Sequence, residues 1–128
     1  MTLRWYGSKF DTVTLQQIRQ IPGVKGVITT LYDTQPGEVW TREAIRALKE
    51  EVEAAGLHIA GIESVNVHDA IKTGAPDRDM YIDNYIQCLE NLGEEGIVHA
   101  LANRNIRVWI FFGKCANSNK KKYFQKGR

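Results

Sequence analysis

A carboxylate and an imidazole stand five residues apart in the segment GIESVNVHDAIKTG, at Glu63 and His68. Both side chains are metal-ligand types, and His68 with the adjacent Asp69 has the make-up of an oriented acid–base pair. A metal site usually needs three or four ligands, however, and no HxH, HxxE or ExxH spacing supplies the others. Three roles for Glu63 and His68 therefore stay open. Contact with a substrate and a structural place in a loop are favoured over metal ligation.

A second constellation, Arg4, Trp5 and Tyr6, lies near the start of the chain. A guanidinium beside two amphipathic rings suits a carboxylated sugar, through a bidentate salt bridge and stacking on the ring face. The same three residues fit a strand that packs its aromatic side chains into the core. The residues alone do not separate these two interpretations.

The strands that must position these residues are indicated by short apolar runs rich in β-branched side chains, near residues 3–6, 25–31 and 58–64. The runs lack the strict apolar–polar alternation of a half-exposed strand, which is typical of strands covered on both faces. A fourth strand is expected to begin at Ile97, directly after Gly96.

Helical patterns separate these runs, and the expected helices follow Thr14, Thr41 and Pro76. Thr14 and Thr41 are expected to cap their helices, because a Thr hydroxyl accepts a hydrogen bond from the first turn. In the second helix, Ile45, Leu48 and Val52 recur at helical spacing and are expected to face the sheet.

Strands that alternate with helices predict a parallel α/β layer. In such folds the loops that follow the carboxyl ends of the strands carry the chemistry. Those loops, WYGSKFD, LYDTQPGEVW and ESVNVHDAIKTG, are long for connections that usually have about 2–6 residues. Both constellations are therefore expected on the same functional face.

The composition, 43% hydrophobic and 25% charged, is that of a globular protein of one domain. No apolar run approaches the roughly 20 residues of a membrane span, and the first residues do not form a secretory signal. Cys88 and Cys115 show no CxxC spacing. A cytoplasmic location is expected.

The charge is divided unequally along the chain. Residues 1–96 hold nine basic and fifteen acidic side chains, a formal net charge of −6, whereas residues 97–128 hold eight basic side chains and no acidic one. The basic end contains aromatic residues, as nucleic-acid-binding segments do. Short basic ends are usually just solvated, so nucleic-acid binding is not favoured.

Several blocks keep the order and spacing of one enzyme family: LRWYG, IRQIPGVKGVITTLYD, PGEVW, LKEEVEAAGL, IESVNVHDAIKTG and RDMYIDNYIQCLENLGEEGI. Through these blocks, from about Leu3 to Ile97, the chain resembles the N-terminal portion of the mannonate dehydratases. These are bacterial enzymes of hexuronate breakdown. The resemblance is specific because the blocks occur together rather than singly.

The resemblance implies an α/β fold, an incomplete (β/α)8 TIM barrel of the xylose-isomerase-like kind, with about three and a half βα units. It implies a metal-dependent hydro-lyase that converts D-mannonate to 2-keto-3-deoxy-D-gluconate and water in glucuronate catabolism. Fe2+ or Mn2+, the family's cofactor, would stabilise the enediolate. Carried over residue by residue, the substrate-binding positions are Arg4, Trp5, Tyr6, Glu63 and His68.

After Ile97 the sequence departs from the family, so residues 1–97 are expected to form the barrel part and 98–128 a divergent basic segment. The family's metal ligands, a His, Cys, His and Asp set, and its catalytic residues belong to later strands. No metal ligand is therefore assigned here, and the ion is not expected to be held tightly.

Two alternatives to an active enzyme stay open, a truncated or frame-shifted inactive fragment and a small binding protein that uses the basic tail. An unclosed barrel is also expected to self-associate.

Overall fold

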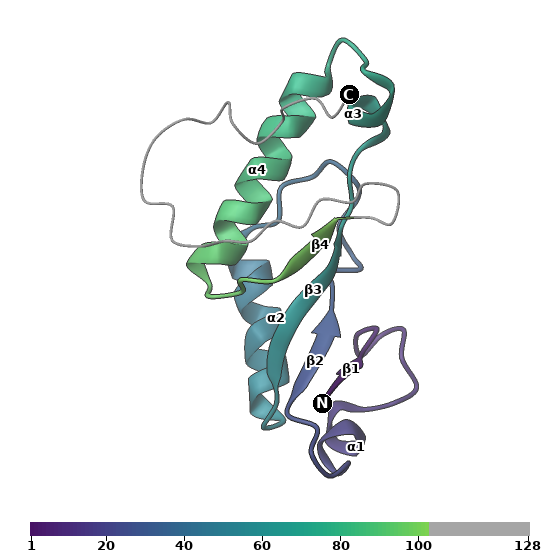
Figure 1. Cartoon of the computed structure of the whole chain (residues 1–128), viewed down its shortest axis with the longest axis vertical. Coiled ribbons are helices and arrows are strands. Elements are labelled where there is room, and N and C mark those ends of the chain that lie inside the picture. Colours follow the sequence, from purple (N-terminus) through teal and green to yellow (C-terminus); the bar gives the residue numbers. More distant parts are fainter. Residues whose placement is uncertain (103–128) are drawn as a thin grey trace.

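The computed structural model describes residues 1–102, which form one four-stranded parallel sheet and its helices (Figure 1). The strands are β1 (Thr2–Arg4), β2 (Gly26–Thr29), β3 (His58–Val65) and β4 (Ala100–Ala102). Each strand pairs in parallel with the next, in the order β1-β2-β3-β4. The predicted parallel α/β arrangement is confirmed, including the fourth strand.

Three of the four helices among the described residues lie where they were expected. They are α1 (Leu15–Arg19), α2 (Arg42–Ala54) and α4 (Arg78–Glu94). The remaining helix, α3 (Asp69–Thr73), occupies a segment that was predicted as loop. Five residues are too few to show a helical period, and Gly74 ends the helix in the left-handed conformation, with φ 71°.

The helix ends follow the predicted capping chemistry. The Thr14 side chain accepts a hydrogen bond from the Gln17 backbone N–H, and the Gln17 side chain accepts one from the Thr14 N–H, which together form a capping box. The Thr41 side chain accepts from the Ala44 N–H. Gly56 follows α2 with φ 77°, a backbone conformation that favours glycine. Local sequence thus determines where α1 and α2 begin and where α2 ends.

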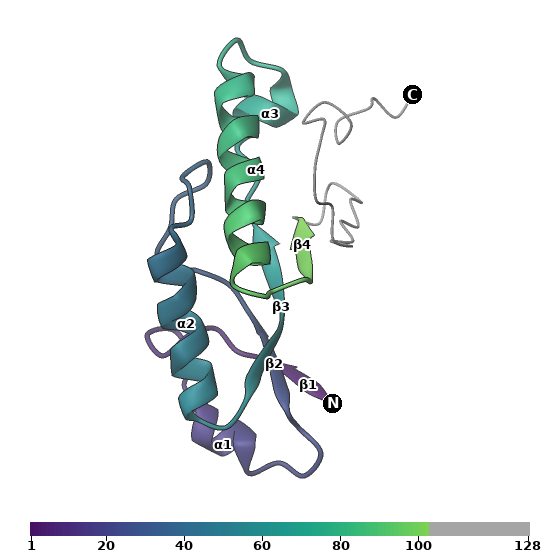
Figure 2. The ribbon, with the colours of Figure 1, turned by 90° about the vertical axis from the view of Figure 1, so that its left-hand side faces the viewer.

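The helices α2 and α4 lie on the same side of the sheet (Figures 1 and 2). The side chain of Val52 is buried in a cluster with α1 and β2, whereas Ile45 is buried in a second cluster with β3 and α4. Leu48 is half-buried and packs against the cluster that contains Val52. The predicted face of α2 is confirmed, and this helix joins both parts of the core.

The loop between β2 and α2 is held along α4 by polar side chains. Asn84 donates to the Gly37 carbonyl (2.9 Å), and Asn91 donates to the Trp40 carbonyl (2.7 Å). Between them the Cys88 sulfur accepts from the Trp40 N–H at 3.1 Å. These three positions share one face of α4 because they are spaced by four and three residues. Burial raises the pKa of the Cys88 thiol, which keeps it protonated.

A second polar contact joins the start of α2 to the end of α4. The Glu95 carboxylate accepts from Arg46 (2.9 Å) and Arg42 (3.2 Å), and its side chain is only 9% exposed. The hydrogen bond from Arg46, helped by that from Arg42, lowers the pKa of Glu95 despite the opposing effect of desolvation. The ionised form of Glu95 is therefore favoured by folding.

In the part of the chain that the structure describes, no helix is both long enough and apolar enough to cross a membrane. The expected divergent segment, 98–128, lies outside the described residues from position 103 onward. Its first residues contribute β4, which pairs with β3.

The Glu95 contact predicts a pH-dependent loss of stability in a Glu95→Gln variant. Because the folded-state pKa of Glu95 lies below its ordinary value of 4.5, the contribution is fully present above pH 4.5. It is lost as the pH falls through the folded-state pKa. We expect Glu95→Gln to melt below the unaltered chain at pH 7, with a difference that shrinks toward pH 3.

A suitable control is Glu90→Gln, which changes an exposed carboxylate on the same helix. Its melting temperature should follow that of the unaltered chain at every pH. If the difference in melting temperature between Glu95→Gln and the unaltered chain stays constant from pH 7 to pH 3, the ion pairs of Glu95 contribute nothing to stability.

Candidate functional site

An ion pair across the sheet defines the candidate site. Arg4, at the end of β1, pairs through Nε with Oε2 of Glu63 on β3, two strands away. The Arg4 guanidinium also lies over the Tyr6 ring, with Cζ 4.4 Å from the ring centroid. The side chains of Arg4 and Glu63 are 51% and 26% exposed, so a ligand can reach both. The structure thus brings together three of the five predicted site residues.

Trp5 is not part of this cluster. Its side chain is only 2% exposed, packs in the core with Leu15 and Ile18, and donates from Nε1 to the Val13 carbonyl at 3.2 Å. Neighbouring side chains in a strand point to opposite faces, so Arg4 and Trp5 cannot both face one site. Of the two interpretations of the Arg4–Trp5–Tyr6 constellation, the core-packing one holds for Trp5.

Tyr32, which follows β2, completes the cluster and was not predicted from sequence. Its ring lies 6.0 Å from that of Tyr6 and 5.8 Å from that of Phe10, centroid to centroid. Burial raises the pKa of the Tyr32 hydroxyl, and the Glu63 carboxylate raises it further, while the Arg4 guanidinium acts in the opposite direction. The available signal was an aromatic hydroxyl three residues after a buried strand, in a loop on the expected functional face.

The loop after β1 is shaped by one carboxylate, Asp11. Its two oxygens accept hydrogen bonds from the backbone N–H groups of Tyr6 (3.1 Å) and Val13 (2.9 Å). These bonds, that from Val13 foremost, lower the pKa of Asp11. Asp11 therefore fixes the backbone that presents the Tyr6 ring beneath Arg4.

The cluster offers three kinds of contact to a small molecule. Arg4 supplies a cation for an anionic group, Glu63 an acceptor for hydroxyl groups, and Tyr6 a ring face for the C–H groups of a sugar. A cluster of this kind, with a few convergent polar groups beside aromatic rings, suits a polyhydroxylated acid.

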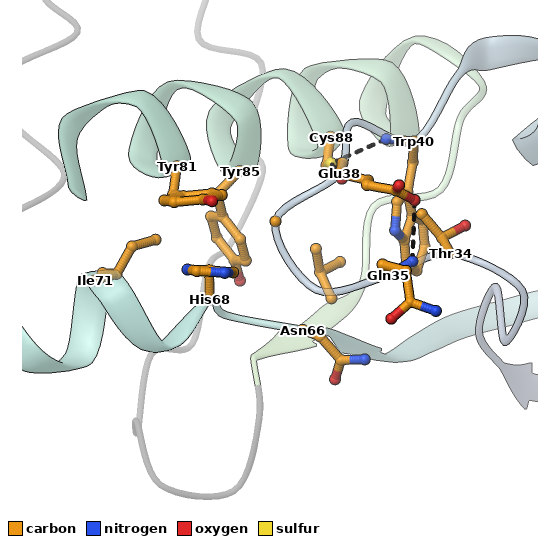
Figure 3. Close-up of a pocket in the computed structure, with 12 residues that line it drawn as sticks. Thr34, Gln35, Glu38, Trp40, Asn66, His68, Ile71, Tyr81, Tyr85 and Cys88 are labelled. Carbon is orange, nitrogen blue, oxygen red and sulfur yellow. Dashed lines mark hydrogen bonds between the residues drawn. The ribbon is translucent and has the colours of Figure 1, made fainter. Parts of the chain in front are cut away.

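His68 lies apart from this cluster and caps α3. Its Nδ1 accepts from the Ala70 N–H at 3.1 Å, and its ring stacks on Tyr81 with 3.7 Å between centroids (Figure 3). The loop residue Gly37 passes so close that a Cβ there would lie 2.7 Å from Tyr81 and 3.0 Å from His68. A neutral ring whose Nδ1 accepts carries its proton on Nε2, so it presents a donor there and not a lone pair for a metal.

The acid–base pair considered for His68 and Asp69 is not formed. Asp69 is instead bound by Lys72, with Nζ 3.0 Å from Oδ1, and this contact lowers the pKa of Asp69. Nor does any recorded interaction within residues 1–102 join Glu63 to His68. In that part of the chain, no group of three or more His, Cys, Asp or Glu side chains converges on a point where a metal ion could bind.

Comparison with known proteins identifies similar chains. A family model described as D-mannonate dehydratase (UxuA) matches residues 1–105. The mannonate dehydratase of Brachyspira hyodysenteriae is 66% identical over 97 residues, 76% of this chain and 27% of that protein. The enzyme of the same name from Lactococcus lactis subsp. cremoris is 58% identical over the same length, with the same coverage of both chains.

A solved structure agrees with these matches. The crystal structure of mannonate dehydratase from Streptococcus suis serotype 2 superposes with a TM-score of 0.75 and 48% identity, covering 78% of this chain and 28% of that one. The chain therefore spans about a quarter of the length of the relatives it matches.

The position of His68 predicts that its side chain contributes to stability as a helix cap. His68→Ala should lower the free energy of unfolding by about 1 kcal/mol, because the Ala70 N–H loses its acceptor. His68→Asn should recover most of this loss, since Asn is among the best N-caps. Urea denaturation of the three chains measures the difference. Equal losses in both variants would show that stacking on Tyr81, and not the cap, stabilises this segment.

Proposed function

The chain belongs to the D-mannonate dehydratase family, and we therefore propose that it forms the amino-terminal part of a hydro-lyase that converts D-mannonate to 2-keto-3-deoxy-D-gluconate and water. The family match over residues 1–105 is the observation that carries this proposal. The setting would be glucuronate catabolism in the cytoplasm. Because the chain spans about a quarter of its relatives' length, the activity is proposed for the complete enzyme.

We propose that β1 to β4 are the first four strands of a (β/α)8 barrel of the xylose-isomerase-like kind. Four parallel strands with three intervening helical connections correspond to three and a half βα units. A closed barrel needs eight strands and about 250 residues. Residues 1–97 would supply β1 to β3 and the helices of this barrel part, and the basic segment 98–128 would begin with its fourth strand, β4. Expressed alone, such an open sheet would self-associate through its edge strands.

We assign substrate binding to Arg4, Tyr6 and Glu63, at the edge of the sheet where active sites of parallel α/β folds lie. His68 would contribute from the neighbouring loop, where its Nε2 proton can be donated to a ligand oxygen. Trp5 would support the site from the core, through the β1 backbone.

The family's Fe2+ or Mn2+ does not fit the residues that the structure describes. Within residues 1–102 no three candidate ligands converge, Glu63 is paired with Arg4, and Nδ1 of His68 is used by the α3 cap. We therefore place the metal ligands and the catalytic residues in the part of the family's length beyond the matched residues.

A chimera tests the proposed function. Residues 1–97 would replace the corresponding 97-residue stretch of the Brachyspira hyodysenteriae mannonate dehydratase, which is 66% identical there. If the segment is a functional part of such an enzyme, the chimera should form 2-keto-3-deoxy-D-gluconate from D-mannonate in the presence of Mn2+. A soluble, metal-loaded chimera without turnover would contradict the proposal.

The same chimera tests the assignment of Arg4. Arg4→Ala should lower kcat/KM for D-mannonate by at least about tenfold, because a charge-assisted hydrogen bond to the substrate is lost. The matched control is Lys25→Ala, which removes an exposed cation at the opposite, amino end of β2 and should leave kcat/KM unchanged. Equal effects of both substitutions would remove Arg4 from the site.

The 128-residue chain by itself is expected to be inactive. Tight binding of a divalent ion depends on three or more converging ligands, and the described residues do not provide them. Calorimetry should detect no saturable Mn2+ site in the micromolar range, and D-mannonate should not be turned over. One tight Mn2+ site that His68→Ala abolishes would reveal a metal centre in this chain.

A further inference from the structure

The hydroxyl group of Tyr32 is buried without a hydrogen-bond partner. Its Oη is inaccessible to solvent, and its proton has no acceptor among the described residues, since the nearby Arg4 guanidinium can only donate. The great majority of buried side-chain polar atoms are paired, so such an atom calls for an explanation. One explanation is that its partner arrives with a ligand.

The surroundings of Tyr32 show what such a ligand would contain. The Arg4 guanidinium is near enough to lower the pKa of the Tyr32 hydroxyl, and the Glu63 carboxylate is near enough to raise it. The ion pair between these two residues uses Nε of Arg4. The Arg4 guanidinium also lies within reach of the Tyr32 oxygen, a contact that lowers the pKa of the hydroxyl. A phenol donor, a cation and a carboxylate acceptor thus meet at one edge of the sheet.

We propose that Tyr32 and Arg4 together bind the carboxylate of a 2-hydroxy acid, while Glu63 accepts a hydrogen bond from the adjacent hydroxyl group. The choice of a 2-hydroxy acid rests partly on the proposed function, since a sugar acid has this pair of groups at one end. The two donors, Tyr32 and Arg4, can each bind one oxygen of the carboxylate. The negatively charged Glu63 would repel a second anionic group but can accept a hydrogen bond from a neutral hydroxyl. A carboxylic acid without a 2-hydroxyl group would bind Tyr32 and Arg4 but would offer no donor to Glu63.

The protonation state of Tyr32 agrees with this role. Burial first, and then the charge of Glu63, raise the pKa of its hydroxyl, so Tyr32 keeps its proton and remains a donor at neutral pH. Its ring is held by contacts with Tyr6 and Phe10. The hydroxyl is therefore held in place before a ligand binds, which reduces the entropic cost of binding.

The full 128-residue chain can be titrated with lactate, propionate, D-mannonate and D-mannitol, with binding followed by NMR. We expect lactate and D-mannonate to bind, propionate to bind more weakly, and D-mannitol, which has no carboxylate, not to bind. Tyr32→Phe should weaken the binding of both hydroxy acids about tenfold, the effect of one hydrogen bond to a charged group. In Glu63→Ala, which has no side-chain acceptor, the preference for lactate over propionate should be lost.

Tyr85→Phe is the matched control, because it removes a hydroxyl from another buried tyrosine, on α4. Its affinities should equal those of the unaltered chain. Thermal melting gives a second readout. Without ligand, Tyr32→Phe should melt at or above the temperature of the unaltered chain, because an unsatisfied buried group has been removed. If the hydroxyl had a purely structural role, its removal would instead lower the melting temperature.

The outcomes separate this inference from the proposed function. If D-mannonate binds equally well to the unaltered chain and to Tyr32→Phe, the role of Tyr32 is refuted and the proposed substrate stands. If lactate binds through Tyr32 but D-mannonate does not bind, the carboxylate site stands, and turnover of D-mannonate by the chimera decides the proposed function separately. If no hydroxy acid binds, the inferred site is refuted.

Discussion

Parallel pairing of β1, β2 and β3 is the constraint on which the candidate site depends. It places the carboxyl ends of all three strands at one edge, so Arg4, Glu63 and the Tyr32 loop meet although they are far apart in sequence. Antiparallel pairing of β2 with either neighbour would send one of these groups to the opposite edge. The chemistry of the site therefore follows from strand direction before any side-chain contact forms.

Strand direction brings the loops to one edge, and local polar contacts then fix their paths. Asp11 binds two backbone N–H groups in the loop after β1, and Asn91 binds the Trp40 carbonyl in the loop after β2. His68 does the same for the segment after β3, as the cap of α3. Each of the three long connections thus has its own side-chain anchor. Since His68 serves as such an anchor, its ring offers a ligand only the Nε2 side.

The sequence was sufficient to predict the parallel α/β arrangement because its signals are local and repeated. Thr41 marks the start of α2, and the spacing of Ile45 and Val52 marks the face that packs on the sheet. The site was harder to predict because it depends on which side of a short strand each residue occupies. Because β1 has only three residues, no pattern shows that Trp5, which follows it, is buried. Nothing in the sequence shows that the Tyr32 proton lacks an acceptor.

The proposed binding site for a sugar acid, at Arg4 and Glu63, depends on this parallel sheet. The most direct measurement is a crystal structure of the chimeric dehydratase with D-mannonate bound. We expect ligand oxygens about 3 Å from the Arg4 guanidinium and from the Glu63 carboxylate, within hydrogen-bond distance. If D-mannonate is bound elsewhere, and the Arg4–Glu63 ion pair is intact and out of contact with it, these two residues do not form the binding site.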